Sequence, residues 1–150
     1  MQLAINQNNI TKAVLGLVLG ISLLIVAHSS FGVPPTGEHH VNQTQTKFMF
    51  SANQANHNLS AYSLDPVTGK PVQLLGSPYK TGKFPVSVVV SPDGKYIYVA
   101  NQGSNSVSVF SLDMEKNTLS EISDSPIAAG KYPDAVDITP DGRFVYVTNE

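Results

Sequence analysis

The sequence contains no cysteine and no tryptophan, and only 13% of its 150 residues are charged. Without cysteine the chain can form no disulfide, no thiolate nucleophile and no cysteine-ligated metal site. The nine Lys and Arg residues are fewer than the eleven Asp and Glu residues, so no basic excess exists to neutralise phosphates. Nucleic acid is therefore not expected as a partner. The hydrophobic fraction of 41% is that of an ordinary folded chain.

Long apolar runs are also scarce, and the one that exists lies near the N-terminus at residues 13–27. Lys12 precedes this run, and the small residues Ser30 and Gly32 follow it. This order is typical of a secretory signal peptide that is cleaved after Gly32. The run is shorter than the roughly 20 residues of a membrane-spanning helix, so an uncleaved anchor is the alternative, and any membrane contact would be limited to it. We assign residues 1–32 to the signal peptide and expect export to the periplasm, the cell surface or the medium.

Residues 33–46 are polar and rich in Pro, Thr, Gln and His, with little to bury, which predicts a linker. His39 and His40 lie within it. Two adjacent histidines in such a segment cannot fix a coordination geometry alone, and no further ligands are evident. We therefore predict no metal site and no cofactor.

The rest of the chain repeats itself with a period of 48 residues. SPDGKYIYVAN at residues 91–101 returns as TPDGRFVYVTN at residues 139–149. When residues 53–102 are aligned with residues 101–150, 18 of 50 positions are identical and no gap is needed. Self-similarity at a fixed period of 40–50 residues indicates a propeller or a solenoid.

Within one period the pattern is that of β-strands joined by tight turns. The expected strands cover residues 86–91, 96–101, 106–112 and 119–123. Four short strands per repeat match one blade of a propeller. The consecutive apolar residues 97–99 and 144–147 predict strands buried on both faces, and a blade between two neighbours supplies that burial.

Two kinds of turn residue recur at the same place in each repeat. Gly94 and Gly142 follow Pro-Asp, where glycine can adopt a positive φ. Gly69 aligns with Asn117, and both residue types tolerate the left-handed conformation. The aspartates of the Pro-Asp-Gly turns, Asp93 and Asp141, resemble a catalytic pair, but their recurrence in the turn assigns them a structural role.

These segments resemble the YVTN-type β-propeller repeat, and NQGSNSVSVF followed by SPIAAGKYP resembles the seven-bladed, lactonase-like propeller family. The resemblance covers residues 47–150. It implies an all-β fold of blades with four antiparallel strands. The family includes 6-phosphogluconolactonases, which open a sugar-acid lactone, and exported or surface repeat proteins without known chemistry.

Residues 47–150 are therefore predicted to form an incomplete ring, with repeats at residues 53–100 and 101–148. They would supply strands two to four of one blade, all four strands of the next and two of a third, or about two and a quarter blades of seven. We expect the chain to be the N-terminal part of a longer protein. A homotrimer whose copies close one ring is the alternative.

The resemblance places the functional residues of the family, histidines and arginines, after the proline of the innermost strand. In this chain those positions hold Val86 and Asp134, so no catalytic residue can be transferred. Asp134 remains a weak candidate for a general base or a ligand of a sugar hydroxyl. Lys83 and Lys131 precede the innermost strands and are weak candidates for binding an anionic ligand.

Other polar residues have structural explanations. Asn53, Asn101 and Asn149 end the second strand of each repeat and are expected to bind turn backbone groups. His57 aligns with Asn105, which indicates a replaceable surface residue. Asp137 is expected to hydrogen bond to a neighbouring turn, because a carboxylate between blades needs a partner.

Two functions follow from these patterns. The first is an exported propeller that binds a small molecule (a sugar or a lactone) or a protein as a surface scaffold. The alternative is a lactonase-like hydrolase with most channel residues in later blades, in which case the 150-residue chain alone would be inactive. Export argues against phosphorylated sugar lactones, which are made inside cells. The absence of His or Arg at Val86 and Asp134 favours the first function.

The repeat predicts that the reading frame continues after the Glu150 codon with four or five more repeats of 48 residues, because a closed propeller needs about four to eight blades. Sequencing the gene downstream of this codon tests the prediction. A stop codon directly after Glu150 would contradict it.

Overall fold

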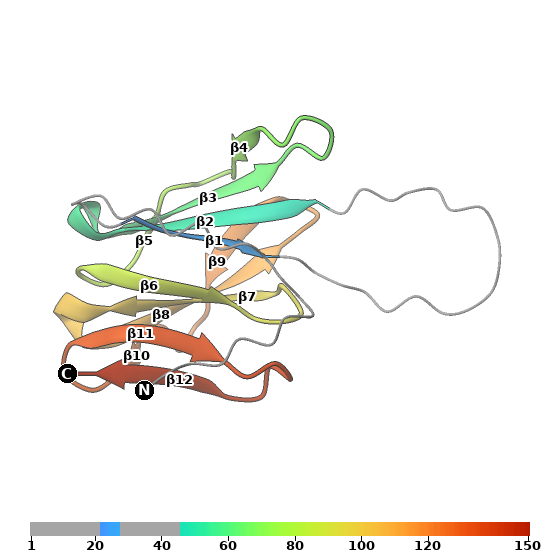
Figure 1. Cartoon of the computed structure of the whole chain (residues 1–150). Helices are drawn as coiled ribbons and strands as arrows, with labels where there is room; N and C mark the ends of the chain where they lie inside the picture. The colour runs from blue at the N-terminus through green and yellow to red at the C-terminus, as the bar shows by residue number, and fades with distance from the viewer. Residues whose placement is uncertain (1–21, 28–45) are drawn as a thin grey trace.

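The computed structural model describes residues 22–27 and 46–150, in which the regular secondary structure is nearly all β-strand (Figure 1). The elements are β1 (Ser22–Ala27), β2 (Lys47–Asn53), η1 (Gln54–Asn56), β3 (Asn58–Leu64), β4 (Pro71–Gln73), β5 (Tyr79–Lys80), β6 (Pro85–Val90), β7 (Tyr96–Asn101), η2 (Gln102–Ser104), β8 (Ser106–Asp113), β9 (Thr118–Glu121), β10 (Ile127–Ala128), β11 (Pro133–Ile138) and β12 (Val145–Asn149). Here η denotes a short 3-10 helix.

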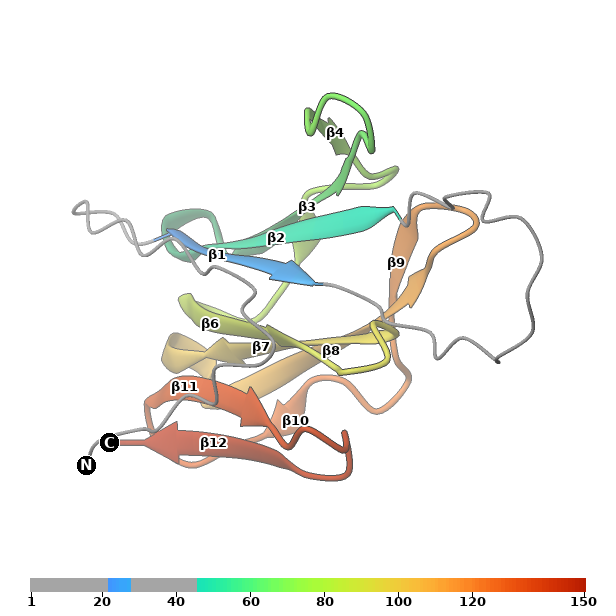
Figure 2. The same cartoon turned by 45° about the vertical axis from the view of Figure 1, so that its right-hand side comes forward.

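The strands form three antiparallel sheets that follow one another along the chain (Figures 1 and 2). The first sheet has the order β1-β2-β3-β4, with β5 also paired to β3. The second runs β6-β7-β8, with β9 and β10 both paired to β8, and the third is the pair β11-β12. This arrangement confirms the predicted all-β, partial propeller with one sheet per blade. The three described sheets do not close a ring.

The innermost position of the first sheet is filled by β1, which the sequence did not predict. Ser22–Ala27 runs antiparallel to β2, with Ser22 opposite Asn53 and Ala27 opposite Phe48. The edge of β2 offers unpaired backbone groups, and an apolar segment nearby can satisfy them. The remainder of the predicted signal peptide lies outside the described residues, as do the linker histidines His39 and His40. No helix in the described part of the chain is long and apolar enough to cross a membrane.

The fourth strand of each blade is divided in two, where the sequence predicted one strand at residues 119–123. It is split into β4 and β5 in the first sheet and into β9 and β10 in the second. Each gap holds a Ser-Pro pair whose peptide bond is cis. Proline has no N–H to donate, and the serine hydroxyl takes the place of a strand partner. Ser77 Oγ accepts from the Ala61 N–H at 2.9 Å, and Ser125 Oγ accepts from the Val109 N–H at 3.0 Å.

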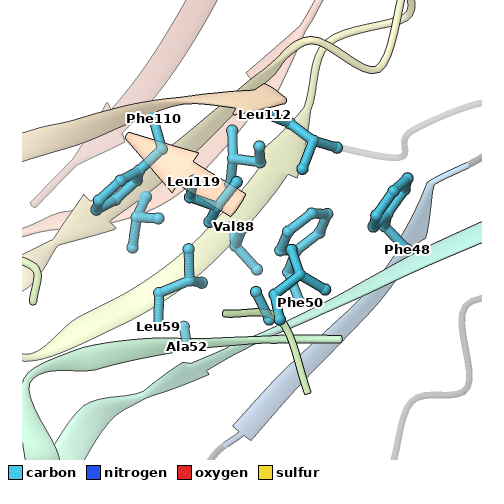
Figure 3. Close-up of a cluster of buried hydrophobic side chains, with 12 residues drawn as sticks. Phe48, Phe50, Ala52, Leu59, Val88, Phe110, Leu112 and Leu119 are labelled. Atoms are coloured by element: carbon cyan, nitrogen blue, oxygen red, sulfur yellow. The ribbon is translucent and has the colours of Figure 1, made fainter. Parts of the chain in front are cut away.

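The hydrophobic core lies between the first and second sheets. Side chains from the two sheets point toward one another there, among them Phe50 and Leu59 from the first and Val88 and Phe110 from the second (Figure 3). The buried members are Phe48, Phe50, Ala52, Leu59, Ala61, Leu74, Val88, Ile97, Val99, Phe110, Leu112 and Leu119. The second sheet therefore has one completed apolar face.

The strand that repeats β7 in the third sheet, β12, is much less buried than β7. Ile97 in β7 is 0% exposed, whereas its repeat counterpart Val145 in β12 is 36% exposed and the adjacent Tyr146 is 62% exposed. Tyr146 lies on the outer face of the third sheet, which no element of the described chain covers, whereas Val145 faces the second sheet and lines a cavity between the two. Burial on both faces is thus confirmed only for the second sheet.

The predicted turn conformations are confirmed. Gly94 and Gly142 have φ angles of 73° and 71°, and Gly69 and its counterpart Asn117 have φ angles of 70° and 53°. The turn aspartates bind within their own turns. Asp93 Oδ1 accepts from the Ser91 hydroxyl at 2.5 Å and the Lys95 N–H at 3.0 Å.

Asp141 repeats this pattern with Thr139 and Arg143. The hydroxyl of the residue two positions earlier is the main cause that lowers the pKa of each carboxyl, Ser91 for Asp93 and Thr139 for Asp141. The structural role predicted for these aspartates is supported by these contacts.

Shortening Ile97 to valine should lower the free energy of unfolding by about 1 kcal/mol, because it leaves a small cavity between the first two sheets. Urea denaturation of the chain monitored by tyrosine fluorescence measures the change. Val67→Ala is the control, because Val67 is 88% exposed and its truncation should leave stability unchanged. Equal stability of Ile97→Val and wild type would contradict the packing of this core.

Asp93→Asn should destabilise the chain at pH 7, because asparagine keeps the acceptor oxygen but loses the charge that strengthens both hydrogen bonds. The folded-state pKa of Asp93 lies below the ordinary value of 3.8. The stability that the charge contributes is therefore fully present above about pH 4 and is lost as the pH falls through the lowered pKa. Thermal unfolding of both proteins between pH 2 and pH 7 tests this. A difference in Tm that persists unchanged at pH 2 would refute it.

Candidate functional site

The candidate site is the edge of the sheets at which the innermost strands β6 and β11 begin, here called the rim. In Figure 1 the rim lies at the end marked by the C-terminus, and the turns η1 and η2 lie on it as well. The innermost strands are neighbours in space, because β6 contacts β1 and β2 on one side and β11 on the other. Residues at the start of β6 and β11 are therefore presented next to one another.

A β-bulge places the predicted channel residues at the rim. Pro85 pairs with Asn101 and Ser87 pairs with Ala100, so Val86 is an extra residue without a partner in β7. Asp134 occupies the same position in the third sheet, between Pro133 and Ala135. A bulge redirects the side chain of its extra residue and is frequent next to active sites. The bulge itself has no signal in the sequence beyond the repeated proline.

The side chain of Asp134 is exposed, and no described residue forms a hydrogen bond or an ion pair with its carboxylate. Its oxygens are therefore available to accept hydrogen bonds from a ligand or to take a proton from water. Val86, its counterpart, is half-buried and can offer only apolar contact. The described residues include no group of three or more His, Asp or Glu that could hold a metal ion.

Lys83 and Lys131 are exposed in the loops that lead into β6 and β11. The backbone of Lys83 is fixed by η2, because its N–H donates to Ser104 Oγ at 3.0 Å and its carbonyl accepts from the Gly103 N–H at 2.9 Å. A Cβ at the preceding Gly82 would lie 2.3 Å from Ser104 Oγ, so only glycine fits. The repeated Gly-Lys pair thus reflects close packing at the glycine, with a solvated lysine on the rim.

The prediction that Asn53, Asn101 and Asn149 bind turn backbone groups is wrong. Asn53 Nδ2 donates to Asn58 Oδ1 and Ser60 Oγ, both at 2.7 Å. Asn101 Nδ2 donates to the hydroxyls of two serines of β8. These contacts join the second strand to the third by side chains. Asn149 Nδ2 donates to a backbone group, the Val147 carbonyl at 3.4 Å, but this carbonyl lies in β12 itself and not in a turn.

Two further polar residues have contacts that the sequence did not predict. His57 Nδ1 accepts from the Phe84 N–H at 3.1 Å, in the loop that enters the next sheet, and its counterpart Asn105 makes the equivalent contact with the Tyr132 N–H. Asp137 does not bind a neighbouring turn. Its Oδ1 accepts from the N–H of the next residue, Ile138, at 2.8 Å, and it is exposed because its face of the third sheet is uncovered.

A cavity of about 460 Å³ lies between the second and third sheets. Its lining is mostly aliphatic, including Val107, Ile127 and Val145, with Tyr98 as a polar member. Burial raises the pKa of the Tyr98 hydroxyl, which therefore stays protonated. None of the candidate residues Lys83, Lys131 and Asp134 lines this cavity, so the site is placed at the rim.

Comparisons with solved structures agree with the propeller architecture. Hydrazine synthase of Kuenenia stuttgartiensis is 31% identical to this chain over 68% of it, with a TM-score of 0.51, and 26% of that protein is covered. A proposed 6-phosphogluconolactonase from Bacteroides uniformis is 22% identical over 68% of this chain and 29% of its own, with a TM-score of 0.60. The periplasmic gluconolactonase of Pseudomonas aeruginosa is 18% identical over 84% of this chain and 36% of its own, with a TM-score of 0.50.

The chain therefore spans about a quarter to a third of the length of the solved structures named above. The similarity to the structures that are less than 25% identical to this chain supports the fold alone. No protein with a curated description matches the chain.

The family model described as Lactonase, 7-bladed beta-propeller, matches residues 71–150, which include the whole second sheet, the third sheet and both bulges. This match agrees with the 48-residue repeat, the antiparallel blades and the bulged innermost strands. The chain belongs to the lactonase family of seven-bladed β-propellers.

Proposed function

We propose that the chain forms blades of a lactonase-type propeller that binds a sugar lactone at its rim and opens it by hydrolysis. The observation that carries the proposal is the family match over residues 71–150. Within these residues, the innermost strand β11 presents the Asp134 carboxylate on a bulge. The names of two structural neighbours, a gluconolactonase and a proposed 6-phosphogluconolactonase, point to the same substrate class.

The reaction needs a water molecule to attack the lactone carbonyl carbon. The ring C–O bond then breaks, the ring oxygen takes a proton and an open-chain hydroxy acid is released. We assign Asp134 to substrate binding, because an exposed carboxylate without a protein partner can accept a hydrogen bond from a sugar hydroxyl. The residues that activate water are expected on innermost strands of blades other than the described ones.

We also propose that the protein is exported and acts on an unphosphorylated lactone. The support is the apolar run at residues 13–27 with a preceding lysine and following small residues. Phosphorylated sugar lactones are made inside cells, so an exported enzyme would not meet them. The exposed lysines Lys83 and Lys131 would then interact with the carboxylate of the acid that hydrolysis releases, because the lactone itself carries no charge.

A binding module without catalysis is the second candidate. Val86 favours it, because the bulge of the second sheet holds an aliphatic side chain where a catalytic propeller would use a polar one. In that case the rim would bind a sugar or a lactone without turning it over.

In the protein expressed from the complete reading frame, Asp134→Asn should raise the KM for glucono-δ-lactone about tenfold with little change in kcat, because it weakens a charge-assisted hydrogen bond to the substrate. Titration of the released acid, corrected for spontaneous hydrolysis, measures the rate. Asp137→Asn is the matched control, since this carboxylate is in the same strand but is bound to Ile138. It should leave KM unchanged.

Three outcomes would change the assignment. A fall in kcat of about a hundredfold in Asp134→Asn would make Asp134 a general base instead of a binding residue. Saturable lactone binding without turnover by the complete protein would establish the binding module. Absence of both binding and turnover would refute the proposed function.

A further inference from the structure

A repeated contact joins each blade to the loop that leads into the next one. In the first blade, the carbonyl of His57 accepts from the Thr81 N–H at 3.2 Å, and its Nδ1 accepts from the Phe84 N–H at 3.1 Å. In the second blade, the carbonyl of Asn105 accepts from the Ala129 N–H at 2.9 Å, and its Oδ1 accepts from the Tyr132 N–H, also at 2.9 Å. We call each pair of bonds a latch.

Each latch holds a strained aromatic residue at the start of an innermost strand. Phe84 and Tyr132 have φ angles of 50° and 48°, a region that bulky residues rarely adopt. The carbonyl of Phe84 accepts from the Gln102 N–H at 2.9 Å, so its peptide groups are held by both blades. Its ring meets the His57 ring edge to face, with centroids 4.9 Å apart. Strain of this kind persists only where neighbouring contacts over-determine it.

The two latches differ in one chemical respect. The amide oxygen of Asn105 accepts a hydrogen bond at any ordinary pH, whereas Nδ1 of histidine accepts only while the imidazole is neutral. A protonated imidazole carries hydrogen on both nitrogens and would direct one of them at the Phe84 N–H. Histidine is the side chain whose charge ordinarily changes between about pH 5 and pH 8.

We propose that His57 makes the junction between the first and second blades pH-sensitive, with the latch closed when the imidazole is neutral and released when it is protonated. The charged side chains on the segments packed around it are Lys80 on β5 and Lys83 in the loop. Residues 53–60, 79–87 and 99–106 contain no Asp or Glu. A protonated His57 therefore has no carboxylate on these segments to replace the lost bond.

Release of the latch would act on the rim. The loop that His57 holds carries Lys83 and continues through Pro85 into the bulge at Val86. Acidification should loosen this end of β6 and leave the start of β11 fixed, because its latch is made by Asn105. The latch joins the two blades whether or not the rim binds a lactone.

Amide hydrogen exchange of the full 150-residue chain, followed by NMR at pH 7.5 and pH 5.5 and corrected for intrinsic exchange rates, tests the proposal. Protection of the Phe84 amide should fall about tenfold on acidification, the loss expected for one hydrogen bond. Protection of the Tyr132 amide should stay the same, so the two amides in one sample are each other's control.

Two variants that swap the latch residues serve as matched tests. His57→Asn should keep Phe84 protected at both pH values, and Asn105→His should transfer the pH dependence to Tyr132. Equal protection of Phe84 at both pH values in wild type would overturn the proposal, and so would a similar loss in His57→Asn. If a variant does not fold, the comparison of the Phe84 and Tyr132 amides in the wild-type protein still tests the proposal.

Discussion

Every sheet in this protein depends on a neighbour to cover its apolar faces. The strands of the second sheet carry apolar residues in succession, so both of its faces must be removed from water. The first sheet covers one of them, and Phe50, Leu59, Val88 and Phe110 form the interface. The hydrophobic effect between sheets, not hydrogen bonding within them, is therefore what sets the blades side by side.

Stacking of the sheets also explains why the rim is built from backbone contacts. Once two sheets are packed, the loop between them has a fixed distance to cross. The loop of residues 81–84 does so with a positive φ at Phe84, a close approach of Gly82 to η2 and two bonds from His57. The same loop returns before β11 with Gly130, Tyr132 and Asn105. The bulges at Val86 and Asp134 follow directly, so the loops position the candidate site.

Prediction from the sequence is most accurate where local chemistry decides the structure. The Pro-Asp-Gly turns and the left-handed position shared by Gly69 and Asn117 follow from residue type alone, and both are confirmed. It was least accurate for side chains whose partners are distant in sequence. His57 lies 27 residues from Phe84, and a single sequence does not show that an imidazole and a main-chain N–H meet across two blades. The serines that divide the outer strand were missed for the same reason.

The amino-acid sequence was enough to predict the repeat length, the strands of one repeat and the family of blades, because periodic apolar patterns and turn residues report local structure. The resemblance to that family also pointed to the positions of Val86 and Asp134. The folded structure was needed to show that these residues stand on bulges, that β1 pairs with β2 and that histidine and asparagine make equivalent latches. Those features depend on the register of paired strands and the distance between packed sheets, which arise only when segments far apart in the chain come together.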